Sequence, residues 1–297
     1  MSAAGGGPEP DLDLPPAWVR LPVESLRGVL MVIGAPNVGK STFARYLFRR
    51  LGEAGVPAAY LDGDPGQSSL GPPAALTLAC ARDGEALFPP RGPRLRRFLG
   101  STSPSGHGGP LLAGAFRLAR AARELGAACV VYDTSGFVDP RRGGSALKLA
   151  KLDLLEPDTV FALQQGDELE SLLRPLRKSR RFRVTGLQAS PAARKRSTAA
   201  RRAYRAAAFA RYFQGSRRLE LRWRGRAVFP APRFLPGRLA GLDDARGFTL
   251  ALAIVLEVDA PARAAQLLTP LPTLDGVDAV HLGDLRVDPQ DFHDRPL

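Results

Sequence analysis

VLMVIGAPNVGKSTFARYL, residues 29–47, is the stretch of sequence that decides the fold. It begins with a compact apolar run rich in β-branched residues, passes through a glycine-containing loop and ends in a helix-like segment. GAPNVGKS at 34–41 fits the pattern GxxxxGK[ST] in the strand, loop and helix context that a phosphate-binding loop requires. The stretch therefore predicts a nucleotide-binding protein of the P-loop class.

Each residue type in this loop has a chemical reason to be there. Glycines let the backbone wrap around phosphates, and the free N–H groups at the start of a helix favour negative charge. Lys40 is expected to reach the terminal phosphates, and the hydroxyl of Ser41 to bind Mg²⁺. The expected nucleotide-binding residues are Gly34, Ala35, Pro36, Asn37, Val38, Gly39, Lys40, Ser41 and Thr42.

One count favours ATP over GTP as the nucleotide. Asn37 is the only asparagine in the chain, so the NKxD element that specifies guanine in many GTPases cannot be present. Other P-loop proteins bind GTP by different means, and GTP therefore stays an alternative.

Further apolar strands alternate with helical segments along the first two thirds of the chain. Strand candidates lie at 58–64, 128–136 and 158–164, and 111–126 is typical of a helix. Such alternation predicts an α/β fold, a mostly parallel sheet covered by helices, which binds ligands at the carboxyl ends of its strands. Short strand candidates and many turn residues after Gly215 predict a small β-rich C-terminal domain.

The expected division of the chain has three parts. Residues 1–27 are expected to form a flexible tail, attached through Trp18, and 28–214 a P-loop domain. The P-loop domain includes an arginine-rich helix at about 194–213, and 215–297 forms the C-terminal domain.

Composition limits the class of protein and its surroundings. Of 297 residues, 44% are hydrophobic and 24% charged, which is typical of a soluble globular protein. The expected location is cytoplasmic, because the longest apolar run falls far short of the roughly 20 residues of a membrane span. The N-terminus has no export pattern, and two cysteines are too few for a disulfide framework.

The net charge of +13 is concentrated in one segment. Between Arg174 and Arg226 there are 18 Lys or Arg residues and a single acid, Glu220. A nucleic-acid partner would account for this clustering, and a solvated basic face without such a partner is the alternative.

Acidic residues close two of the expected strands. Asp62 and Asp64 end the second strand, and Asp133 ends the third. Phosphoryl transfer needs a metal ion and a group that accepts or orients the acceptor proton, and these carboxylates are suited to both tasks. The alternative for each is an ordinary turn or helix-cap aspartate.

Five segments, in this order and spacing, resemble the Clp1/Grc3 family of polynucleotide 5′-hydroxyl kinases, in its compact prokaryotic form. They are GAPNVGKSTFARYL, YLDGDPGQSSLGPPAAL, GSTSP, YDTSGFV and KRSTAARRAYRAAAFARYF. DGDPGQ and the arginine-rich segment are more specific to the family than the phosphate loop. The similarity covers roughly residues 28–290 and implies that 28–214 is a kinase domain.

The resemblance assigns roles by position. Lys40 and Ser41 correspond to the pair that binds ATP and Mg²⁺, and Asp64 to the catalytic aspartate that accepts or orients the proton of the 5′-hydroxyl. Arg196, Arg201 and Arg205 correspond to arginines of a lid that closes over the phosphates, and their spacing predicts one common helix face. The expected metal ligands are Ser41, Asp64, Gln67 and Asp133.

Three residues are candidates for contact with nucleic acid: Phe137, Gln67 and His107. Phe137 stands where the family often has a tryptophan that stacks on the nucleic acid, so it is expected either to stack or to pack in the core. The resemblance implies that about 27 residues stand in place of the N-terminal β domain of the eukaryotic relatives, so their substrate preference is not expected to transfer.

Together these features predict a kinase that moves the γ-phosphate of ATP to the 5′-hydroxyl of RNA or DNA, with Mg²⁺, in RNA processing or repair. The expected partners are RNA or DNA 5′ ends, without a membrane, and protein partners stay open. The alternatives are a regulatory P-loop ATPase or GTPase, a non-catalytic ATP-binding scaffold in RNA processing, and a small-molecule kinase.

Overall fold

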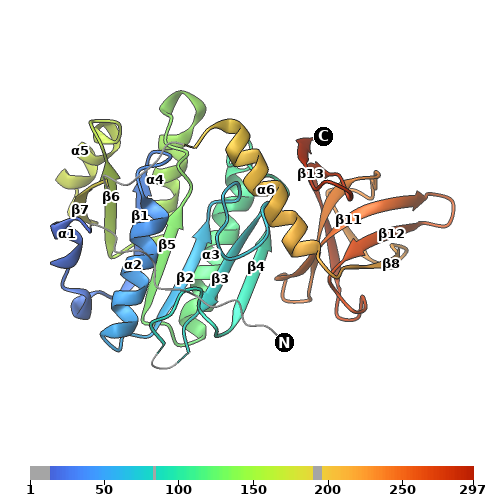
Figure 1. The fold of residues 1–297 in the computed structure, drawn as a ribbon, viewed down its shortest axis with the longest axis horizontal. Coiled ribbons are helices and arrows are strands. Elements are labelled where there is room, and N and C mark those ends of the chain that lie inside the picture. Colours follow the sequence, from blue (N-terminus) through green and yellow to red (C-terminus); the bar gives the residue numbers. More distant parts are fainter. Residues whose placement is uncertain (1–13, 83–84, 190–195) are drawn as a thin grey trace.

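The computed structural model describes residues 14–82, 85–189 and 196–297. Within these ranges the chain forms two sheets of seven strands each, placed side by side. Helix α6 (Thr198–Phe213) runs from the first sheet to the second, as Figure 1 shows. The α/β fold with a second, β-rich part is the one that the sequence predicted.

The first sheet contains the phosphate loop. Its strands are β1 (Gly28–Gly34), β2 (Ala58–Gly63), β3 (Ala75–Cys80), β4 (Arg94–Phe98), β5 (Cys129–Thr134), β6 (Thr159–Gln164) and β7 (Arg183–Gln188). The spatial order is β4-β3-β2-β5-β1-β6-β7. All pairs among β1, β2, β5, β6 and β7 are parallel, whereas β3 and β4 add an antiparallel edge. The predicted mostly parallel sheet is confirmed, and β1 lies near its centre.

Both faces of this sheet are buried. Val29, Met31 and Ile33 of β1 belong to a core covered by α3 (Gly108–Glu124), α4 (Gly144–Leu155) and α5 (Glu170–Lys178). The alternate β1 residues Leu30 and Val32 belong to a second core with α2 (Lys40–Glu53). This alternation places helices on both faces, as parallel sheets require.

The segment before β1 packs against α2. It forms α1 (Pro16–Val19) and a short 3₁₀ helix (Val23–Ser25). Elsewhere in the chain, a second 3₁₀ helix (Pro140–Arg142) precedes α4. Trp18 is fully buried, with its ring edge-on to that of Phe43 at 5.0 Å between centroids. Residues 1–13 of the expected tail lie outside the described residues.

The second sheet is mainly antiparallel. Its strands are β8 (Arg217–Arg222), β9 (Ala227–Phe229), β10 (Arg238–Asp243), β11 (Thr249–Asp259), β12 (Ala264–Thr269), β13 (Ala279–Val287) and β14 (Asp294–Pro296). The order is β14-β13-β10-β11-β12-β8, with β9 parallel to β13.

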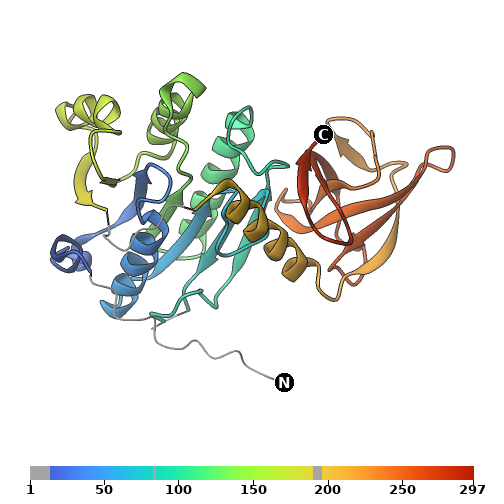
Figure 2. The ribbon, with the colours of Figure 1, turned by 45° about the horizontal axis from the view of Figure 1, so that its top comes forward.

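Helix α6 belongs to both parts of the molecule. In its C-terminal half, Phe209 and Phe213 are buried in a core with Leu252, Ile254 and Leu285 of the second sheet. Figure 2 shows the same helix leading from the first sheet into the second. The domain boundary near residue 214 stays a prediction, because the helix that precedes it is packed into both parts.

The described residues of the basic segment 174–226 belong to several separate elements. Its residues are distributed over α5, β7, α6 and β8, which lie in different parts of the molecule (Figure 1). Within the described ranges, every helix is too short or too polar to cross a membrane.

Candidate active site

The phosphate loop connects the carboxyl end of β1 to the first residue of α2. Asn37 and Gly39 have positive φ angles of 64° and 90°, which bend the backbone before the helix begins at Lys40. Lys40 is 7% exposed, and its Nζ donates a hydrogen bond to the carbonyl of Ala35 at 2.6 Å. The amine therefore lies over the phosphate loop.

The charges around Lys40 come from three separate segments. Burial lowers the pKa of Lys40, while Asp133 and Asp64 act in the opposite direction and Arg201 adds to the lowering. These four groups thus share one electrostatic environment. Two carboxylates, a lysine and an arginine near a phosphate loop form a site suited to a bound anion and a cation.

Asp133 ends up beside the first turn of α2. It accepts hydrogen bonds from the side chain of Ser41 and from the hydroxyl of Tyr60, the latter at 3.0 Å. Burial is the main cause that raises the pKa of Asp133, and the Ser41 hydrogen bond and Lys40 oppose it. Oδ1 of Asp133 is buried without a hydrogen-bond partner among the described residues.

This arrangement fits a magnesium ion. A hydroxyl and a carboxylate side by side, with one carboxylate oxygen unpartnered, are hard oxygen donors of the kind that Mg²⁺ takes together with phosphates and water. The described part of the chain has no group of three or more His, Cys, Asp or Glu residues that could hold a metal by itself. Ser41 and Asp133 alone would make a partial ligand set, which nucleotide phosphates and water would complete.

Asp62 and Asp64 have different surroundings although they stand two residues apart. Oδ2 of Asp62 accepts hydrogen bonds from the hydroxyl of Ser68, from both the amide and the hydroxyl of Ser69, and from the amide of Leu70. Burial, together with Asp133, raises the pKa of Asp62 to about 6. Asp62 is 1% exposed and shapes the loop that follows β2.

Asp64 is half-buried, and only one of its oxygens is used locally. Oδ1 accepts hydrogen bonds from the amides of Gly66 and Gln67 at 3.0 and 3.1 Å. These bonds fix the carboxylate in a tight turn at the carboxyl edge of the sheet. The other oxygen, Oδ2, accepts no hydrogen bond from the described residues, so it can accept one from an incoming group.

The arginine-rich segment begins differently from the prediction. The helix starts at Thr198, because the Ser197 side chain caps it by accepting the amide of Ala200. Arg196 therefore precedes the helix, and the predicted single helix face for all three arginines is wrong for this one. Residues 194 and 195 of the expected lid helix lie outside the described residues.

Arg196 nevertheless lies at the phosphate loop. Its amide is 3.4 Å from Oδ1 of Asn37, and its guanidinium lies 5.5 Å from the ring centroid of Tyr204. The hydroxyl of Tyr204 donates to the carbonyl of Ser68 at 2.7 Å. The start of α6 is thus held against both the phosphate loop and the loop after β2.

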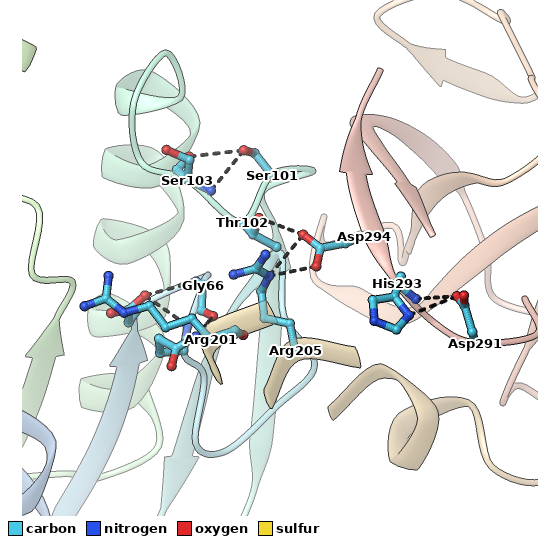
Figure 3. A network of polar contacts seen from close by, with 11 residues as sticks. Gly66, Ser101, Thr102, Ser103, Arg201, Arg205, Asp291, His293 and Asp294 are labelled. Atoms are coloured by element: carbon cyan, nitrogen blue, oxygen red, sulfur yellow. Dashed lines mark hydrogen bonds and ion pairs between the residues drawn. The ribbon is translucent and has the colours of Figure 1, made fainter. Parts of the chain in front are cut away.

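Arg201 and Arg205 share α6 but have different neighbours (Figure 3). Arg201 lies beside Gly66, and its carbonyl is 3.5 Å from Nε2 of Gln67. Arg205 instead forms an ion pair with Asp294 of β14. Arg201 is therefore near Lys40 and Asp64, whereas the guanidinium of Arg205 is engaged with the second sheet.

The three candidates for nucleic-acid contact have different neighbours. Gln67 donates to the carbonyl of Gly66 at 2.6 Å, and no contact within the described ranges joins it to Ser41 or Asp133. His107 precedes α3 and points to the second sheet, with Nε2 3.2 Å from Oδ2 of Asp284. Phe137 is half-buried against the main core, with the Arg142 guanidinium 5.8 Å from its ring centroid.

Four residues of the site region were missed by the sequence analysis. Tyr60 binds Asp133, Asp294 binds Arg205, and Lys148 and Lys151 of α4 are buried behind β5. The two lysines carry a signal in the sequence, because they stand among leucines and alanines in ALKLAKLDLL at 146–155. A charged residue amid an apolar helix face is rarely buried without a partner or a function.

A central β1, a loop bent at Asn37 and Gly39, and the Ser41–Asp133 pair define a P-loop nucleotide-binding protein. The sequence profile described as "mRNA cleavage and polyadenylation factor CLP1 P-loop" matches residues 34–215, which is more than half of the chain. The chain belongs to this family.

Two relatives with curated names align with 63% and 89% of the chain. The polyribonucleotide 5′-hydroxyl-kinase of Methanocaldococcus jannaschii is 30% identical over 188 residues, which cover 63% of this chain and 51% of the relative. The one of Pyrococcus abyssi is 24% identical over 324 residues, covering 89% and 90%. In the 188-residue alignments at 30–31% identity, the chain spans about half the length of the relatives.

A solved structure has a similar fold. The Clp1p chain in a complex of wild-type Clp1p with Pcf11p superposes with a TM-score of 0.66 at 13% identity. The superposition covers 88% of this chain and 74% of that one. At this identity the likeness concerns the fold.

Proposed function

We propose that this protein is a polynucleotide 5′-hydroxyl kinase that transfers the γ-phosphoryl group of ATP to the 5′-hydroxyl of RNA or DNA. The observation that carries the proposal is the shared environment of Lys40, Asp64 and Arg201, which come from three different segments. The names of the archaeal relatives give the acceptor class, and the lone asparagine of the chain favours ATP as the donor.

The reaction needs one bond formed and one broken. The 5′-oxygen of the acceptor attacks the γ-phosphorus, the bond from that phosphorus to the β–γ bridging oxygen breaks, and ADP leaves. The proton of the 5′-hydroxyl passes to the carboxylate of Asp64, whose position is fixed by the amides of Gly66 and Gln67. Lys40 and Arg201 stabilise the negative charge on the transferred group.

Magnesium is the metal that the site fits. Ser41 and Asp133 would hold it, and the ion would neutralise charge on the β- and γ-phosphates. Asp64 and Gln67 are further candidates from the sequence. We assign Asp64 to the acceptor because its Oδ1 is held in the turn, which leaves the other oxygen to meet the 5′-hydroxyl.

The acceptor is a nucleic-acid end, for which Phe137 is the candidate stacking residue.

We place the protein in the cytoplasm, because Cys80 and Cys129 are both buried and unpaired, which suits a reducing compartment.

The test is transfer of labelled γ-phosphate from ATP to matched RNA and DNA oligomers with free 5′-hydroxyls. Wild type should label at least one of them, whereas oligomers that already carry a 5′-phosphate should stay unlabelled. Asp64→Asn should reduce transfer by about 10²–10⁴-fold while ATP still binds. Hydrolysis of ATP that is indifferent to 5′-hydroxyl ends would instead support a regulatory ATPase, and ATP binding without turnover would support a scaffold.

A further inference from the structure

Two lysines on α4, Lys148 and Lys151, are buried with exposures of 1% and 0%. Burying an ammonium group is costly unless it is hydrogen-bonded or serves a function. The two residues stand three positions apart on one helix, yet their surroundings differ. The amine of Lys148 has hydrogen-bond partners, whereas that of Lys151 has none among the described residues.

Lys148 is bonded to the turn that follows β5. Its Nζ donates to the hydroxyl of Thr134 at 2.7 Å and to the carbonyl of Ser135 at 2.6 Å. The hydroxyl of Thr134 in turn donates to the carbonyl of Val32 on β1, also at 2.7 Å. Lys148 therefore fixes the backbone of the turn and the side chain that ties this turn to β1.

The same turn lies directly against the phosphate loop. A Cβ added to Gly136 would be 2.8 Å from both the N and the Cα of Pro36, so the two backbones are in contact with no space for a side chain. The Ser135 carbonyl held by Lys148 immediately precedes this contact. The position of the turn thus limits the position of the loop at Pro36.

Lys148 also shares the charge environment of the site. Burial lowers its pKa, the neighbouring amines of Lys151 and Lys40 add to the lowering, and Asp64 and Asp133 oppose it. The amine therefore interacts electrostatically with Lys40, Asp64 and Asp133 of the nucleotide site.

We propose that Lys148 is a positioning residue for nucleotide binding, which holds the turn 134–136 against the phosphate loop so that the loop keeps its binding shape. The inference rests on the proposed function only in that the loop binds ATP. It does not depend on which acceptor receives the phosphate.

Lys151 offers a matched control. It is equally buried and lies on the same helix, but its Nζ has no hydrogen-bond partner among the described residues. It lies 4.9 Å from the ring centroid of Tyr132. Replacing either lysine by methionine keeps an unbranched side chain and removes one amine, so the two variants differ mainly in whether hydrogen bonds to the turn 134–136 are broken.

The experiment measures the ATP dissociation constant and the Tm of wild type, Lys148→Met and Lys151→Met. Lys148→Met should weaken ATP binding about tenfold or more, on the order of one lost hydrogen bond. Lys151→Met should bind ATP within about twofold of wild type. Equal affinity for wild type and Lys148→Met, or equal weakening in both variants, would overturn the inference.

A second variant covers the case in which Lys148→Met does not fold. Gly136→Ala inserts a methyl group at the contact with Pro36 and leaves Lys148 in place, and it should also weaken ATP binding. Normal ATP affinity in Gly136→Ala would count against the inference. The outcomes for the two proposals are separable: failure of phosphate transfer with these affinity changes intact overturns only the kinase, and a wild type that binds no ATP overturns both.

Discussion

Nε of Arg205 lies 2.9 Å from Oδ1 and 3.0 Å from Oδ2 of Asp294. The side chains are 15% and 4% exposed, and Oδ2 also accepts a hydrogen bond from Thr102. This pair joins α6 to β14 across the boundary between the two sheets, as Figure 3 shows. Arg205, which the resemblance assigned to the phosphates, thus has a partner on the second sheet.

The first prediction concerns the stability that this pair confers. Asp294→Asn leaves the Arg205 charge without its partner, which typically costs about 3–5 kcal/mol when the pair is buried. The free energy of unfolding from denaturant titration should fall by that order. Asp291→Asn is the control, because Asp291 is exposed in the same segment, and it should change stability little. Equal stability of the two variants would contradict a structural role for the pair.

The second prediction separates the two arginines of α6 that follow one another. Arg201 is half-buried near Lys40, whereas Arg202 is exposed. Arg201→Ala should lower kcat for phosphate transfer by about 10²–10³-fold, as loss of one group that stabilises developing charge does. Arg202→Ala should retain the kcat of wild type. A similar kcat for both variants would remove Arg201 from the site.

The third prediction contrasts Asp62 with Asp64. Asp62→Asn removes a carboxylate that accepts several hydrogen bonds from 68–70, so we expect a lower Tm and a disordered loop. Asp64→Asn should keep the Tm of wild type and lose transfer. Thermal melting and labelled transfer, measured on the same preparations, check both halves. Reversed effects in the two variants would exchange their roles.

The fourth prediction is a pH dependence of stability from Lys151. Burial lowers its pKa from 10.5 to about 7, an effect that Asp64 and Asp133 oppose. Between these pH values the unfolded chain holds a proton that the folded chain has released, so this group's contribution to stability rises with pH. The unfavourable contribution is complete below pH 7 and is lost as the pH approaches 10.5.

Lys151→Met removes this contribution. The variant should exceed wild type in Tm most clearly at pH 6–7, and the difference should shrink toward pH 9.5. Melting curves at four or five pH values are sufficient. A difference that stays constant across this range would mean that Lys151 is not buried as an unpaired amine.

The sequence predicted those features that depend on local pattern. The phosphate loop is defined by consecutive residues, and the apolar strands β1, β2, β5 and β6 are continuous hydrophobic runs. By contrast, β4 reads RLRRF and was missed, because its arginines lie at an edge strand where polar side chains reach solvent or the second sheet. Burial at an edge depends on the partner and not on the strand's own sequence.

Roles that depend on distant partners could not be predicted in the same way. Asp62 and Asp64 are the same residue type two positions apart, and only the folded loop shows which hydrogen bonds each carboxylate accepts. Arg205 has the spacing of a phosphate-binding arginine, but Asp294, which pairs with its guanidinium, lies 89 positions further along the chain. Neither contact leaves a local trace in the sequence.

Phe209 and Phe213 make the last turns of α6 part of the interior of the second sheet, whereas Arg201 stands two turns earlier beside the phosphate loop. A rigid rod mounted in this way works as a lever. A rotation of the second sheet that carried α6 with it would displace Arg201, so a molecule bound only to that sheet would then change how the transferred phosphoryl group is stabilised. Probes attached to β12 and to α2 would measure such a rotation directly, as a distance that changes when ATP is added.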